Sequence, residues 1–123
     1  MSLYIKNPKS TFIHIPKTGG TSISTWLKNA YGVNYNKGFK HASYEEMKRT
    51  FGDLGFTYTV VRNPWDRVVS AYFYYKRKNS PIVKSVNGMM SFREYMQDVG
   101  KAVIMSQQSL ATDEIDLVLK FHI

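Results

Sequence analysis

The 123-residue chain contains 17 lysine and arginine residues against 9 aspartate and glutamate residues, which gives it a formal net charge of +8. This length predicts a single domain, residues 1–123, and the positive charge favours anionic partners such as nucleotides, nucleic acids, acidic glycans or a membrane surface. Because 43% of the residues are hydrophobic and none is cysteine, the composition excludes a disordered chain, a disulfide framework and a thiolate metal site.

The first ten residues are expected to form a polar lead-in, followed by a buried strand. Residues 12–15 form a short, mostly apolar run typical of such a strand. After the Gly19-Gly20 turn, Thr21 and Ser22 can cap a helix that runs to about Tyr31. The apolar residues of that helix predict one buried stripe: Ile23, Trp26, Leu27, Ala30 and Tyr31.

This strand–glycine–helix segment predicts an anion site. Glycine lets the main chain approach a ligand closely, and a helix N-terminus presents free N–H groups and the positive end of the helix dipole. Lys17 adds a full positive charge at the same place. The segment lacks the G-x-x-x-x-G-K-[ST] string, which disfavours an ordinary Walker-type ATPase or kinase. The alternative is an ordinary strand–turn–helix connection with a surface lysine.

The middle of the chain predicts a loop and a short helix. Residues 32–40 are rich in asparagine, glycine and lysine and are typical of a loop. Ser43, followed three residues later by Glu46, fits a capping box, so a helix should run from there to about Phe51. Gly52 should then end the helix.

A second buried strand is predicted over residues 56–61, where β-branched and aromatic residues dominate. Asn63 can cap the helix that follows, because Pro64 suits its first position, and the helix should stop before Pro81. Its apolar residues predict a buried stripe: Trp65, Val68, Val69, Tyr72 and Phe73.

The C-terminal part predicts a loop over residues 79–90, a short helix over 92–97 and an ambiguous stretch over 98–112. Alternating apolar residues over 115–123 predict a last, mostly buried strand. Strands that alternate with helices imply an α/β fold with parallel pairing and helical crossovers. We therefore expect a P-loop-like three-layer sandwich, in which helices flank a central parallel sheet.

Arg62 and Ser70 form a second candidate anion site. Ligands of an open parallel sheet bind beyond the carboxyl ends of its strands, so the Lys17 loop and Arg62 should border one crevice. Arg62 and Ser70 can grip a second phosphate, the arginine through its bidentate fork. The alternative, which the spacing alone favours, is an Arg62–Asp66 pair with Ser70 as a plain surface residue.

Two stretches of the sequence resemble the motifs of sulfotransferases that use 3′-phosphoadenosine 5′-phosphosulfate (PAPS). Residues 12–22 look like the 5′-phosphosulfate loop of these enzymes, and residues 61–72 look like their 3′-phosphate motif. The sequence is most similar in character to the carbohydrate sulfotransferases, which include the heparan sulfate 2-O and 6-O and the chondroitin 4-O enzymes. The resemblance is clear over about residues 10–75 and weaker beyond.

The resemblance implies a role for each matching residue. The 3′-phosphate would be held by Arg62 and Ser70, and the 5′-phosphosulfate by Lys17, Thr18, Gly19, Gly20, Thr21 and Ser22. The last strand resembles the Val-Asp-x-Val-Leu-x-Phe-Glu segment of the family, with His122 in place of the glutamate. Family members continue beyond this segment with a part that closes over cofactor and acceptor, so the chain looks short at its C-terminus.

Sulfuryl transfer places two catalytic demands on the chain. Lys17 suits the first, which is to neutralise the leaving phosphate, and no metal is required. His41 is the candidate base for the acceptor hydroxyl, because histidine titrates near neutrality and the resembling glycan enzymes place a catalytic histidine in this region. The alternative for His41 is an exposed loop histidine without a catalytic role, and His14, inside a strand, is expected to be structural.

Five basic residues can form a rim for an acidic acceptor, or else a plain solvated surface: Lys37, Lys40, Lys76, Arg77 and Lys78.

The sequence therefore predicts a PAPS-dependent sulfotransferase that acts on a hydroxyl acceptor, expected to be a carbohydrate. One alternative is a truncated relative that binds PAPS, or its product PAP, without turnover. The other is a basic nucleic-acid-binding protein, against which the basic residues are dispersed and form no recognised motif. The sequence shows neither a signal-peptide core nor a membrane-spanning run, which predicts a cytoplasmic protein.

Overall fold

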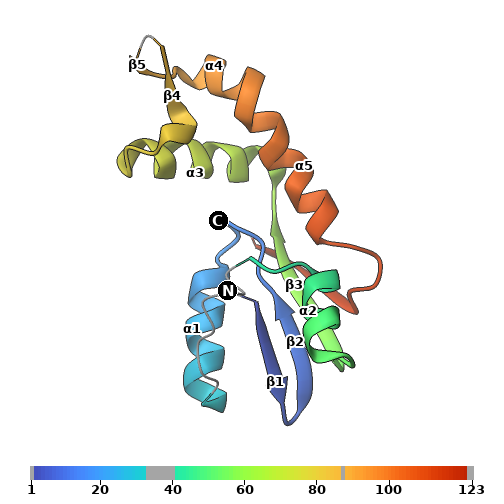
Figure 1. Ribbon diagram of the computed structural model, residues 1–123. Helices are drawn as coiled ribbons and strands as arrows, with labels where there is room; N and C mark the ends of the chain where they lie inside the picture. The colour runs from blue at the N-terminus through green and yellow to red at the C-terminus, as the bar shows by residue number, and fades with distance from the viewer. Residues whose placement is uncertain (1, 33–40, 87, 122–123) are drawn as a thin grey trace.

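A four-stranded sheet with the strand order β1-β2-β3-β6 forms the centre of the computed structural model, which describes residues 2–32, 41–86 and 88–121 (Figure 1). Strand β2 (Lys9–Ile13) runs parallel to β3 (Phe56–Arg62), which runs parallel to β6 (Leu117–Phe121). Strand β1 (Leu3–Lys6) is antiparallel to β2. These pairings confirm the α/β class with a mostly parallel central sheet.

The prediction that the chain begins with a polar lead-in is wrong, because residues 3–6 form an edge strand of the sheet. Leu3 pairs with Phe12 in a hairpin whose turn contains Asn7-Pro8. Leu3 and Ile5 are buried, and the strand was missed because its alternation spans only four residues, too few to stand out in the sequence.

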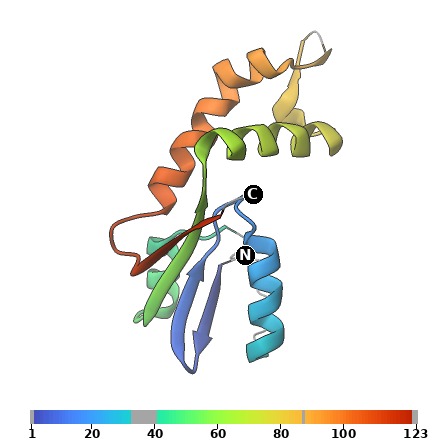
Figure 2. The same cartoon turned by 180° about the vertical axis from the view of Figure 1, so that it is seen from behind.

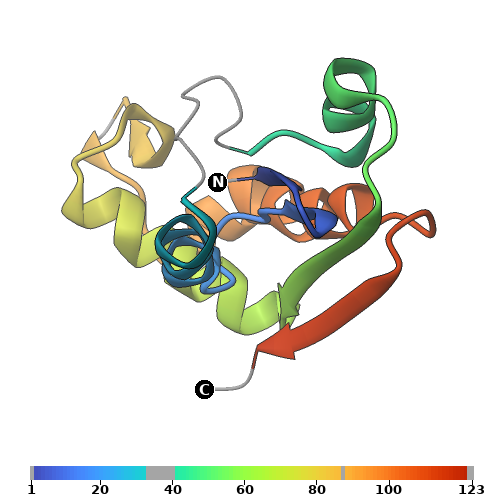
Figure 3. The ribbon, with the colours of Figure 1, turned by 90° about the horizontal axis from the view of Figure 1, so that it is seen from below.

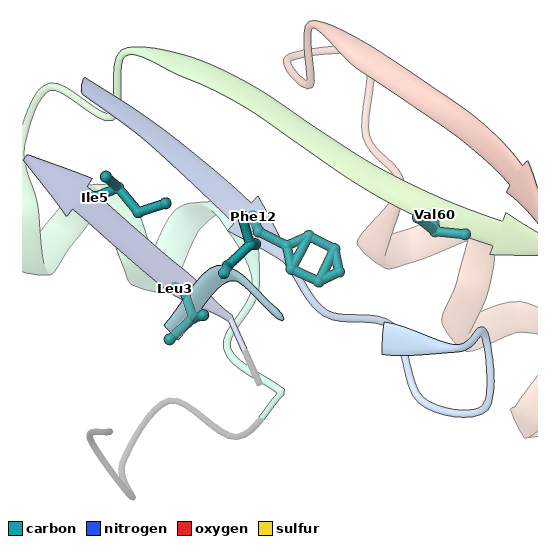
Figure 4. Close-up of a cluster of buried hydrophobic side chains, with 5 residues drawn as sticks. Leu3, Ile5, Phe12 and Val60 are labelled. Carbon is teal, nitrogen blue, oxygen red and sulfur yellow. The ribbon is translucent and has the colours of Figure 1, made fainter. Parts of the chain in front are cut away.

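Two helices cover opposite faces of the sheet. Helix α1 (Gly20–Tyr31) lies on one face and α2 (Tyr44–Phe51) on the other, as the view along the sheet shows (Figure 3). Since side chains of a strand alternate between faces, neighbouring residues of β2 enter different clusters. The cluster under α1 contains Leu3, Ile5, Phe12, Leu27 and Val60 (Figure 4). The cluster under α2 contains Ile13, Ala42, Met47, Leu54 and Ile115. The expected three layers are therefore present.

Beyond the carboxyl end of β3, the chain builds a mostly helical part (Figures 1 and 2). Helix α3 (Pro64–Arg77) leads out from the sheet, and a long helical run leads back to β6. Between α3 and β6 the elements are η2 (Pro81–Val83), β4 (Lys84–Ser85), β5 (Gly88–Met89), α4 (Phe92–Tyr95), the π-helical η3 (Met96–Gly100) and α5 (Lys101–Leu110). The ambiguous stretch over residues 98–112 is thus mostly helical. A third cluster, Val68, Tyr72, Val83 and Tyr95, holds this part together.

The predicted caps of α2 and α3 are confirmed. Ser43 Oγ accepts a hydrogen bond from the backbone N–H of Glu46 at 3.2 Å. Asn63 Oδ1 accepts one from the N–H of Trp65 at 2.9 Å, and Pro64 occupies the first helical position. Each cap bonds a backbone group only two or three residues away, so the local sequence determines it.

The expected cap of α1 is wrong. Its N-cap is Gly19, in the left-handed conformation with φ 82°, and no side chain caps the helix. Because Gly19 adopts the left-handed conformation of the cap, the helix begins at Gly20. Thr21 and Ser22 therefore lie inside its first turn and not before it.

The predicted apolar stripes of α1 and α3 are also partly wrong. In α1, Trp26 is 63% exposed, and the buried residues are Gly20, Ser24 and Leu27. In α3 the exposed set is Trp65, Val69 and Phe73, and the buried set is Arg67, Val68, Ala71 and Tyr72. The buried faces overlap the predicted stripes at Leu27, Val68 and Tyr72 and extend to Ser24 in α1 and to Arg67 and Ala71 in α3.

Strand β6 lies at the edge of the sheet and is not mostly buried as predicted: Leu117, Val118 and Leu119 are exposed. A reciprocal clamp fixes its start. Asp116 Oδ2 accepts hydrogen bonds from Thr57 N at 2.8 Å and Thr57 Oγ1 at 3.0 Å, and Thr57 Oγ1 accepts one from Asp116 N at 3.0 Å.

Across the described ranges, no helix is both long and apolar enough to cross a bilayer.

Replacing Asp116 by alanine should lower the free energy of unfolding by about 1–2 kcal/mol, because two donors of Thr57 lose their acceptor. Urea denaturation measures this change. As a control, Asp113→Ala removes the same charge from the exposed turn before β6 and should change stability by no more than about 0.5 kcal/mol. Equal denaturation midpoints for the two variants would contradict the clamp.

Candidate functional site

The loop between β2 and α1 is stabilised by a hydrogen bond within the loop, and no side chain caps the start of α1. Lys17 and Gly19 both adopt positive φ angles, 63° and 82°. Thr18 is fully buried, and its hydroxyl donates a hydrogen bond to the carbonyl oxygen of Ile15 at 2.7 Å. Because no side chain caps α1, its first N–H groups remain available for an anion.

Lys17 sits among other positive charges. Its ammonium nitrogen lies 4.2 Å from the centre of the Tyr74 ring, a cation–π contact. Burial lowers the pKa of Lys17 below its usual value, and the charges of Arg77 and Arg62 lower it further. A bound anion would relieve this repulsion, so the arrangement favours a negatively charged ligand.

Arg62, at the end of β3, contacts the Lys17 loop. Its Nη1 donates to the carbonyl oxygen of Lys17 at 3.4 Å, which confirms that the ends of the two strands meet. The amide of Gln107 holds the backbone of Arg62: its Oε1 accepts from Arg62 N at 3.1 Å, and its Nε2 donates to Arg62 O at 2.9 Å. Ser70 is partly exposed on α3, about two turns into that helix.

Arg67 joins three segments, and the sequence analysis missed it. Its side chain is 2% exposed. Nε donates to Pro16 O at 2.7 Å, Nη2 donates to Ser106 Oγ at 3.0 Å, and Nη1 donates to Val103 O. Burial lowers the pKa of Arg67. A basic residue beside an apolar stripe predicts a surface position, so the sequence held no signal for this role.

A cavity of about 830 Å³ opens between α1 and the C-terminal half of α3. Its described lining residues include lysines and histidines but neither aspartate nor glutamate. They are His14, Pro16, Lys17, Thr21, Ser24, Thr25, Lys28, His41, Tyr74, Tyr75, Lys78 and Ser80. The cavity therefore brings Lys17, Thr21 and His41 together, whereas Arg62 and Ser70 are not part of its lining.

Two histidines meet at this cavity. The rings of His14 and His41 lie 4.8 Å apart, centre to centre, in an edge contact with an interplanar angle of 62°. His41 is exposed, whereas His14 is buried as a structural residue would be, although β2 ends at Ile13 and His14 follows the strand rather than lying inside it as predicted. A Cβ on Gly20 would lie 2.1 Å from His14 Cδ2, so the imidazole packs directly on the first residue of α1.

The structure supports only part of the suggested basic rim. Lys78 lines the cavity together with Lys28, which the sequence analysis did not single out. Lys37 and Lys40 lie outside the described residues. Over the described part of the chain, no group of three or more histidine, aspartate or glutamate residues is arranged to hold a metal ion.

Replacing Arg67 by methionine should lower the free energy of unfolding by about 3 kcal/mol, because the part-buried oxygens of Pro16, Val103 and Ser106 each lose a guanidinium donor. Guanidinium denaturation measures the loss. Arg77→Met removes the same charge from the exposed end of the same helix and should cost no more than about 0.5 kcal/mol. An Arg67→Met variant as stable as the wild type would show that the guanidinium does not hold these segments together.

A family model described as the sulfotransferase family matches residues 4–117. The matched range contains the Lys17 loop, His41, Arg62 and Ser70. Comparison with curated proteins and with solved structures found no match. The family transfers sulfuryl groups, and because its model covers most of the sequence, the chain belongs to the sulfotransferase family.

Proposed function

We propose that the chain transfers the sulfuryl group of PAPS to a hydroxyl group, and that the acceptor is a carbohydrate. The observation that carries this proposal is the contact between the two cationic segments, with Arg62 Nη1 at 3.4 Å from Lys17 O. This contact supports a single donor site, because it joins Arg62 to the loop that carries Lys17, and Lys17 lines a cavity together with His41. We further propose that residues 1–123 act as one PAPS-binding domain.

The chemistry of the residues fits PAPS, which carries a phosphate at the 3′ position and supplies an activated sulfuryl group at the 5′ end. We assign the 3′-phosphate to Arg62 and Ser70, because a guanidinium fork and a hydroxyl both donate to phosphate oxygens. The 5′-phosphosulfate would lie against Lys17 and the N–H groups of residues 18–22. Thr18 would contribute through its backbone, since its hydroxyl already bonds within the loop.

Lys17 would stabilise the charge that develops on the leaving phosphate. An ammonium group that is partly buried interacts more strongly with an anion than a fully solvated one does. The neighbouring Arg62 and Arg77 add to the positive potential. Lys17 thereby contributes most in the transition state, where the negative charge is greatest.

His41 would remove the proton of the acceptor hydroxyl with one of its ring nitrogens. Its exposed position in the lining of the cavity that Lys17 also lines supports this role. Tyr75 offers an aromatic ring to a sugar, and Lys28 and Lys78 offer cations to acidic groups on it. A chain that bound PAP but never transferred sulfate would instead be a binding module.

Isothermal titration calorimetry should show tighter binding of PAP than of AMP, which lacks the 3′-phosphate. Arg62→Ala should weaken PAP binding by about 2 kcal/mol, because a charge-assisted contact is lost, and should leave AMP binding almost unchanged. Arg93→Ala, which removes the same charge from the exposed surface of α4, is the control and should bind both ligands like the wild type. Equal wild-type affinities for PAP and AMP would contradict the 3′-phosphate site.

His41→Ala should leave PAP affinity nearly intact and slow sulfate transfer by about 10²-fold, the usual scale for loss of a general base. Transfer from radiolabelled PAPS to a panel of glycans measures the rate. The wild-type rate should fall in acid, because a protonated imidazole cannot accept a proton, and this acid limb should vanish in the variant. A variant that kept both the full rate and the acid limb would rule His41 out as the base.

A further inference from the structure

His41 enters the cavity from a segment that a single hydroxyl ties to the end of β2. Ser2 is 2% exposed, and its Oγ donates to the carbonyl oxygen of Ala42 at 2.8 Å. The same Oγ accepts a hydrogen bond from the backbone N–H of His14 at 2.9 Å. Ser2 therefore links the residue that follows His41 to the residue that follows strand β2.

The side chain of His14 makes a second link between the same places. Its ring contacts the His41 ring on one side, at 4.8 Å between centres. It also lies against Gly20, where even a methyl group would collide with it, and it stacks on Phe12 at 6.1 Å. One buried imidazole thus touches the sheet core, the first residue of α1 and the exposed histidine.

We propose that Ser2 and His14 are positioning residues that fix His41 relative to the Lys17 loop. This inference rests on the proposed roles of His41 and of that loop. A base works only within hydrogen-bond reach of the proton it removes, and small displacements in an active site lower rates strongly. The ring of His14 lies between the imidazole of His41 and the start of α1 and sets the distance between them. The hydroxyl of Ser2 holds the backbone of Ala42, next to His41, against the backbone of His14.

A role limited to core packing makes a different prediction. If the two residues only packed the core, replacing them would lower stability, and His41 would not respond to a ligand at the Lys17 loop. Positioning by Ser2 and His14 requires that a ligand bound at the start of α1 be sensed at the His41 ring. The test is therefore a signal from His41 itself, which NMR of the histidine-labelled full chain provides, with the His41→Ala variant identifying the signal.

The first variant is Ser2→Ala, which removes the hydroxyl link and keeps both histidines in the sequence. The Cε1–H signal of His41 should move toward that of a histidine in an unfolded chain, because the ring leaves the His14 edge. Sulfate transfer should fall about tenfold, and PAP affinity should stay near that of the wild type. Ser10→Ala is the matched control, since the Ser10 hydroxyl bonds only the nearby Pro8 carbonyl at 3.0 Å, and it should leave the signal unchanged. A folded Ser2→Ala protein with an unmoved His41 signal would overturn the proposal.

The second variant is His14→Ala, which removes the spacer. Addition of PAP should shift the His41 signal in the wild type and should not shift it in this variant, although PAP still binds. A shift retained in His14→Ala would overturn the proposal, and if this variant does not fold, Ser2→Ala decides. A wild-type chain that binds no PAP would instead overturn the donor assignment, together with any positioning relative to it. Binding of PAP with an unmoved Ser2→Ala signal would overturn the positioning alone.

Discussion

The buried guanidinium of Arg67 is the interaction on which the arrangement of the site depends. It donates hydrogen bonds to Pro16 in the loop between β2 and α1 and to Val103 and Ser106 in α5. The loop, α3 and α5 are far apart in the sequence, and one rigid, planar group fixes their mutual positions. Because the donors reach carbonyl and hydroxyl oxygens rather than a carboxylate, the positive charge of Arg67 adds to the cationic character of the region.

The positive charges of this region repel one another in the free protein, and a bound anion would relieve that repulsion. Lys17 is partly buried and lies near Arg62 and Arg77, so its pKa is lowered. The described lining of the adjoining cavity supplies no carboxylate to balance it. Anion binding would then restore favourable electrostatics, which is the behaviour expected where a protein handles phosphate and sulfate groups.

The features predicted correctly from the sequence are those that neighbouring residues determine. Ser43 and Asn63 cap helices through backbone groups two or three residues away. The features missed depend on distant segments. Trp65 belongs to an apolar stripe yet is exposed, because packing against α5 selects the neighbouring face of α3. The burial of Arg67 and the contact of His14 with His41 follow from residues dozens of positions apart, which no local pattern encodes.

The central claim is that the loop before α1 and the end of β3 together hold one donor molecule. A crystal structure of the chain with PAP tests it most directly. We expect the 5′-phosphate within hydrogen-bond reach of Lys17 and the N–H groups of residues 18–22, and the 3′-phosphate within reach of Arg62 and Ser70. A structure in which PAP lay elsewhere, for example with its phosphates at Lys28 and Lys78 and neither motif in contact, would contradict it.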